Sequence, residues 1–175
     1  MPAMAAASSP GPARRRARGR LPLAVPRIRA RAEASASPAT VWALLSDPAR
    51  WPDFDPLLAG AEGPTAVAGA RWRLRGAGLP GRVVPWFRGI AVELERAEPE
   101  HELVLAASPL PGLRERIALR LLPLPRGRTD VELSATLAGP LAASWWPVAR
   151  VAAPLVVRGL ARAAAQEPGP TAEAS

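Results

Sequence analysis

The sequence contains no cysteine, no lysine and no tyrosine, and its one histidine is His101. Without cysteine, disulfides and thiolate metal sites are excluded. Without cysteine and lysine, covalent catalysis through a thiolate or a Schiff base is excluded as well. A Ser–His–Asp arrangement would depend on His101, and neither a Gly-x-Ser-x-Gly turn nor a glycine-rich phosphate loop is present. The chemistry open to this chain is therefore narrow.

Positive charge is unevenly distributed along the chain, although the net charge is +8. Residues 1–31 carry eight arginines and no acid, whereas residues 32–175 carry 15 arginines and 15 acidic residues. We expect residues 1–22 to form a disordered Arg-rich tail, residues 23–166 to form one domain, and residues 167–175 to form a second disordered tail. The domain is then nearly neutral, and specific nucleic-acid binding is not expected of it.

The sequence predicts neither a twin-arginine export signal nor a membrane-spanning segment. After the N-terminal arginines only LPLAVP precedes Arg27, which is too short for a twin-arginine signal. The apolar C-terminal stretch is interrupted by Arg150, Arg158 and Arg162, which is incompatible with a transmembrane helix. We expect a cytoplasmic protein.

Two helix starts follow the first predicted strand. Residues 25–34 alternate between Arg or Glu and apolar residues, as a half-buried strand does. Ser37-Pro38 and Asp47-Pro48 each place a capping side chain before a proline, the usual beginning of a helix. Two short helices ending near Phe54 are predicted.

The rest of the chain predicts strands and one long helix. Alternating segments occupy residues 71–75, 90–96, 101–107, 113–121 and 131–137, separated by Pro- and Gly-rich turns. Residues 141–165 are Ala-rich with apolar residues at helical spacing, and Pro154 is expected to kink that helix. The order predicts an α+β fold with an antiparallel sheet of about seven strands and its helices on one face.

The first third of the domain resembles a known superfamily. The motifs Ser37-Pro38, Val41-Trp42, Leu44-Leu45, Ser46-Asp47-Pro48 and Arg50-Trp51-Pro52 are similar to the opening of SRPBCC proteins, which include the polyketide cyclase/dehydrase group and the START lipid-transfer domains. The resemblance extends over about residues 26–165. It implies a helix-grip fold, in which a curved sheet wraps around the C-terminal helix and encloses a cavity for lipids, polyketides or other apolar ligands. Some members catalyse cyclisation or dehydration.

The apolar faces of the predicted strands and of the last helix are the candidate cavity lining. As a set they predict a largely apolar pocket, as ligand sites usually have. By alternation and helical spacing, these residues are Trp72, Leu74, Ile90, Val92, Leu94, Leu103, Leu105, Ile117, Leu119, Leu133, Val148, Val151 and Leu155.

Aromatic residues and inward polar residues are the remaining candidates. The chain has six Trp but two Phe and no Tyr, and we place Trp51, Phe54 and Trp86 at the cavity mouth. Continued alternation turns Arg96, His101 and Glu115 inward at strand ends. These three are weak candidates for acid–base catalysis.

No metal or cofactor is expected. Asp53, Asp55 and Glu62 would make only a weak oxygen site. The leading hypothesis is therefore a binder of a hydrophobic small molecule without strong catalysis. Two alternatives stay open: a cyclase or dehydratase, and a protein that contacts membrane or nucleic-acid surfaces weakly through its Arg-rich tail and exposed Trp residues.

Overall fold

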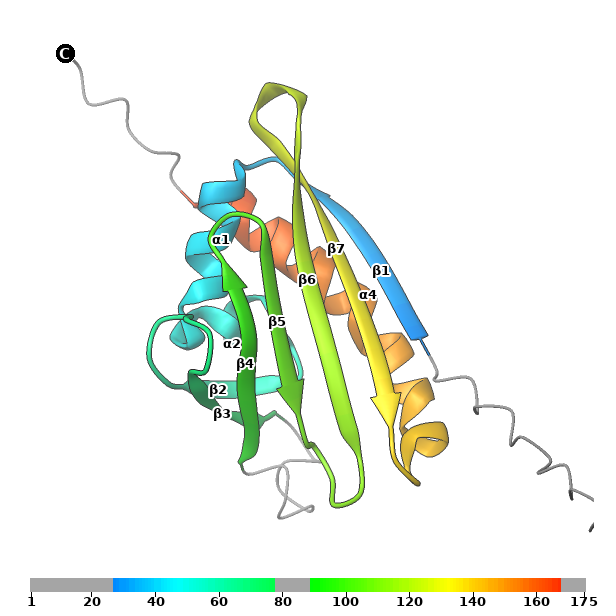
Figure 1. Cartoon of the computed structure of the whole chain (residues 1–175). Coiled ribbons are helices and arrows are strands. Elements are labelled where there is room, and N and C mark those ends of the chain that lie inside the picture. The colour runs from blue at the N-terminus through cyan, green and yellow to red at the C-terminus, as the bar shows by residue number, and fades with distance from the viewer. Residues whose placement is uncertain (1–26, 78–88, 168–175) are drawn as a thin grey trace, which may run out of the picture.

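A seven-stranded antiparallel sheet lies across one long helix in the computed structural model, which describes residues 27–77 and 89–167 (Figure 1). The strands are β1 (Arg27–Ala34), β2 (Leu58–Glu62), β3 (Arg71–Gly76), β4 (Ile90–Glu98), β5 (Glu102–Ala107), β6 (Arg114–Leu124) and β7 (Arg128–Ala138). The helices are α1 (Pro38–Ser46), α2 (Trp51–Phe54) and α4 (Ala142–Gln166), with 3₁₀ turns at Pro48–Arg50 and Pro125–Gly127.

Side-chain caps begin the first helical segments, as the sequence predicts. The Ser37 hydroxyl accepts a hydrogen bond from the backbone N–H of Thr40 at 3.2 Å. The Asp47 carboxylate accepts one from the N–H of Ala49 at 2.9 Å. Each cap satisfies an amide that would otherwise be unpaired at the start of a helix.

The sheet has the order β1-β7-β6-β5-β4-β3-β2, and the helix-grip fold is confirmed. Its one strand without a sequence-based prediction is β2, an edge strand of sequence LAGAE with a register shift between Leu58 and Gly60. Alanine and glycine have low strand propensity, so this segment gave no alternating signal. It pairs with β3 and closes that side of the sheet.

The long helix α4 packs against β1, β7, α1 and α2. Its buried side consists largely of small residues, including Ala149, Ala153 and Ala164, together with the larger Val157 and Leu160. The helix continues through Pro154, which removes one backbone donor. Glu167, which the sequence analysis assigns to the C-terminal tail, forms an ion pair with Arg50 beside α2.

Gly159 allows α4 to touch the end of α2. A methyl group on Gly159 would overlap the carbonyl oxygen of Phe54 and stand 2.9 Å from its carbonyl carbon. Phe54 itself is buried, at 2% exposure. The position is therefore closed to any larger side chain unless the two helices separate.

We predict that Gly159→Ala destabilises the protein. In an ordinary helix this change stabilises by about 1 kcal/mol, but overpacking against a backbone group typically costs about 1–3 kcal/mol or more. The free energy of unfolding, measured with urea, should therefore fall. The matched control is Gly89→Ala, where the new methyl group would meet the Arg73 side chain at an ordinary 3.5 Å. A Gly159→Ala variant as stable as the wild type would show that α2 is not held by this contact.

Candidate functional site

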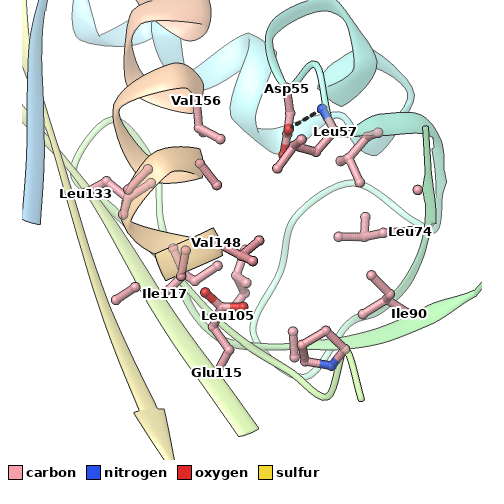
Figure 2. Close-up of a pocket in the computed structure, with 18 of the residues that line it drawn as sticks. Asp55, Leu57, Leu74, Ile90, Leu105, Glu115, Ile117, Leu133, Val148 and Val156 are labelled. Carbon is pink, nitrogen blue, oxygen red and sulfur yellow. Dashed lines mark hydrogen bonds between the residues drawn. The ribbon is translucent and has the colours of Figure 1, made fainter. Parts of the chain in front are cut away.

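A cavity of about 140 Å³ lies between α4 and the inner face of the sheet (Figure 2). Its wall is apolar except for two carboxyl groups. The lining consists of Trp51, Asp55, Leu57, Leu58, Leu74, Gly76, Ile90, Leu105, Ala107, Pro109, Glu115, Ile117, Leu133, Ala135, Trp145, Val148, Ala149, Ala152, Ala153 and Val156.

The opening of this cavity is marked by two of its lining residues. Leu57 follows α2 and Val148 lies on α4, and each is 45% exposed while also lining the cavity. An apolar ligand entering between them would cover both side chains.

Asp55 is held at the end of α2 by its local sequence. Its backbone N–H donates to the carbonyl of Trp51 at 2.9 Å, and Pro56 follows it, so the helix ends there. Its Oδ1 accepts a hydrogen bond from the N–H of Leu57 at 2.9 Å. The side chain enters the cavity, and the residue is 9% exposed (Figure 2). Burial raises its pKa from the ordinary 3.8 to about 6, although the Leu57 hydrogen bond opposes the shift.

Glu115 enters the cavity from the opposite side, near the start of β6 (Figure 2). Burial is the main cause that raises its pKa. A hydrogen bond from Trp145 of α4 lowers that pKa, and the negative charge of Asp55 raises it again. The two carboxyl groups therefore interact across the cavity.

The cavity presents no cation to these acids among the residues that the structure describes. Its lining contains neither arginine nor histidine. The arginines of the surrounding elements β3, β6 and α4 are all exposed. Asp55 and Glu115 are thus two acids that face an apolar space, and no described residue that lines it is basic.

The comparisons with known proteins identify the family. A family model described as polyketide cyclase/dehydrase and lipid transport matches residues 25–167. This chain belongs to that family. The SRPBCC superfamily predicted from the sequence is thereby confirmed. No curated protein matches the chain.

Several solved structures share the fold of this polyketide cyclase/dehydrase family member. The ZhuI aromatase/cyclase from a Streptomyces species is 14% identical, with a TM-score of 0.62 over 80% of this chain and 93% of that one. Protein MLL2253 from Mesorhizobium loti is 17% identical, with a TM-score of 0.63 over 78% and 95%. A hypothetical protein from Helicobacter pylori is 14% identical, with a TM-score of 0.64 over 94% and 99%. At these identities the likeness shows the fold alone.

The predicted cavity residues divide into three groups. Six of them line the cavity: Leu74, Ile90, Leu105, Ile117, Leu133 and Val148. Five others are buried in the core but are not part of the lining, namely Trp72, Val92, Leu94, Leu103 and Leu119. The other two, Val151 and Leu155, are 64% and 38% exposed, so their assignment to the cavity was wrong. They lie at helical spacing with Val148, but the Ala-rich side of α4 is the one that packs inward.

Two of the three catalytic candidates lie outside the cavity. A register shift between Leu94 and Arg96 breaks the alternation of β4 against β5. The Arg96 side chain is 56% exposed and binds Glu102 at 3.2 Å, so the inward prediction for Arg96 was wrong. His101 lies in the exposed turn after β4, with its Nδ1 2.9 Å from the carbonyl of Pro99. Of the three, Glu115 alone lines the cavity.

Two of the three predicted mouth residues, Trp51 and Phe54, belong to a buried aromatic cluster. Trp51 is 4% exposed and lines the cavity, and its ring lies 5.4 Å from that of Phe54 and 5.3 Å from that of Trp72. The indole N–H of Trp51 donates to the carbonyl of Leu45. Trp51 and Phe54 are therefore wall and core residues, not rim residues. Trp86 lies outside the described residues.

The weak oxygen site is not assembled. Asp53 pairs with Arg50 and Glu62 pairs with Arg75, both at the surface, whereas Asp55 faces the cavity. Across residues 27–77 and 89–167, no three acidic or histidine side chains gather as metal ligands would. In the same ranges no helix is long and apolar enough to span a membrane.

Asp55 had one sequence signal that was not used. It lies between Phe54 and Pro56, directly after a predicted helix with a buried apolar side. Because its neighbour in the sequence is a buried apolar residue, an acid in this position lies close to the core. We interpreted it only as an oxygen ligand.

We predict that Asp55→Asn stabilises the protein at neutral pH. The unfolded chain ionises Asp55 near pH 3.8 and the folded chain near 6, so stability falls as pH rises between these values. The difference between the two pKa values corresponds to a loss of at most about 3 kcal/mol in the free energy of unfolding. Asparagine keeps an acceptor for the Leu57 N–H and has no charge to bury. Urea unfolding at pH 4 and pH 7.5 should show the gain at pH 7.5.

The matched control for this change is Asp53→Asn, two residues away and exposed. It should produce no gain at pH 7.5. If both variants respond alike, Asp55 is not a desolvated acid.

Proposed function

We propose that this protein binds a compact hydrophobic small molecule in the cavity between α4 and the sheet. The observation that carries the proposal is the apolar lining, interrupted by Asp55 and Glu115 alone. Ligand sites usually have this composition, an apolar wall with a few polar groups that orient the ligand. The family description, which includes lipid transport, supports the same class of function.

The volume of the cavity limits the size of the ligand that it accepts without a rearrangement of the protein. A cavity of about 140 Å³ is close in size to an apolar protein cavity that holds benzene. The group that occupies it in this conformation is therefore of the size of one aromatic ring or a short branched chain. A larger lipid or polyketide would extend through the opening beside Leu57 and Val148.

We predict that benzene and toluene bind here and that filling the cavity abolishes the binding. Ala107 lines the cavity from β5, whereas its neighbour Ala106 is on the opposite face of the strand. Ala107→Leu should remove the binding measured by ligand-detected NMR, because its new methyl groups occupy the space. Ala106→Leu is the matched control and should bind as the wild type does. Equal binding by both variants would contradict the proposal.

A second proposed function is acid–base chemistry of the cyclase or dehydratase type. A carboxyl with a pKa of about 6 is close to the value at which one group both accepts and donates protons near neutral pH. The aromatase/cyclase among the structural neighbours shares the fold. In this proposal Asp55 removes a proton from the carbon next to a ligand carbonyl, and Glu115, whose pKa is raised by burial, gives a proton to the carbonyl oxygen.

We predict for this second function that the protein accelerates deuterium incorporation into a small aryl ketone such as acetophenone in heavy water. The rate, followed by proton NMR, should fall at least tenfold in Asp55→Asn. His101→Ala is the control, because His101 lies outside the cavity. If the ketone binds but its deuterium incorporation is no faster than in buffer, the protein binds the ketone without catalysing the exchange.

The surface-binding alternative is less well supported. Trp145 lines the cavity, and Trp146 is half-buried with the Arg150 guanidinium 4.9 Å from its ring centroid. The Arg-rich tail lies outside the described residues. A cytoplasmic location stays a prediction.

A further inference from the structure

The carboxyl pair in the cavity lacks the partners that this chain gives to another buried acid. Glu102, 8% exposed, is held by Arg120 at 2.6 Å and by Arg96 at 3.2 Å. The hydrogen bond from Arg120 is the main cause that lowers its pKa. At Glu102, two arginines thus compensate the charge of the acid.

Asp55 has a similarly small exposed fraction, 9%, but no arginine among the described residues pairs with it. Its Oδ1 accepts the Leu57 N–H, the one hydrogen bond to this carboxyl that the described residues supply. Across the cavity lies Glu115, another acid, which binds the indole of Trp145. From α2, β6 and α4, the charged groups that line the space are Asp55 and Glu115 alone. An ionised carboxylate in such surroundings is strongly unfavourable unless a positive charge joins it.

We propose that the cavity selects an organic cation, a compact apolar or aromatic group carrying a protonated amine that lies between Asp55 and Glu115. The ammonium would donate a hydrogen bond to the Asp55 carboxylate and compensate its charge, while Glu115 faces it across the cavity. Trp51 and Trp145 also line the space, and indole rings attract cations. A neutral alcohol would donate a hydrogen bond but would leave the charge of the pair uncompensated. This inference rests on the proposed binding function and names its ligand class.

Three probes of one skeleton test the proposal: toluene, benzyl alcohol and benzylamine. Their dissociation constants are measured by calorimetry on the full chain at pH 7.5 and low salt. Benzylamine should bind at least tenfold more tightly than benzyl alcohol. In Asp55→Asn and in Glu115→Gln this preference should fall below threefold. Glu93→Gln, which removes an exposed acid on β4, is the matched control and should keep the preference.

The pH dependence gives a second readout. A cation binds the ionised form of Asp55, so benzylamine affinity should fall as pH decreases through about 6, where Asp55 takes up its proton. Binding at pH 6 should release protons, which is detected as a heat that depends on the ionisation enthalpy of the buffer. Toluene binding should show neither effect.

Each result decides between the two proposals. If toluene and the other probes all fail to bind, the proposed binding function is wrong and this inference falls with it. If toluene binds and benzylamine binds no better than benzyl alcohol, the binding function stands and the cation inference is overturned. A preference for benzylamine that survives in both Asp55→Asn and Glu115→Gln would place the cation elsewhere and would also overturn the inference.

Discussion

The close approach of α4 to α2 at Gly159 is the contact on which the site depends. Gly159 lies against the carbonyl of Phe54, and Asp55 is the next residue along the chain. Pro56 then directs the backbone away, so Asp55 has little freedom to leave the cavity. A backbone contact at a glycine thus fixes both the helix pair and the position of the carboxyl group.

The same arrangement explains why three of the residues that α4 contributes to the cavity wall are alanines. Ala149, Ala152 and Ala153 line the cavity where larger side chains would fill it. Farther along the helix, Val157 and Leu160 are completely buried and close the core. The helix therefore changes from a cavity wall to a packing surface within about two turns. Small residues leave the space, and the large aliphatic residues beyond them stabilise the fold that surrounds it.

Prediction from the sequence succeeded where a local pattern determines the structure. The caps at Ser37 and Asp47, the alternation of the long strands and the extent of α4 all depend on neighbours in sequence. It failed where one residue changes the periodicity or where two periodic stripes compete. The register shift before Arg96 turned that side chain outward, and α4 offered both a Val–Leu stripe and an Ala stripe. Glu115 was found because β6 keeps its alternation, whereas Asp55 depends on a contact between distant helices.

The buried acids connect the stability of the empty protein to its affinity for a ligand. A charge on Asp55 at neutral pH destabilises the folded chain, because the unfolded chain hydrates the same carboxylate freely. A positive ligand that joins the pair removes part of this penalty, and the energy recovered appears as binding. A neutral ligand of equal size recovers none of it. The negative charge that destabilises the folded protein with an empty cavity is therefore the same feature that would distinguish a cation from its neutral analogue. Replacing Asp55 should raise the stability and lower the selectivity.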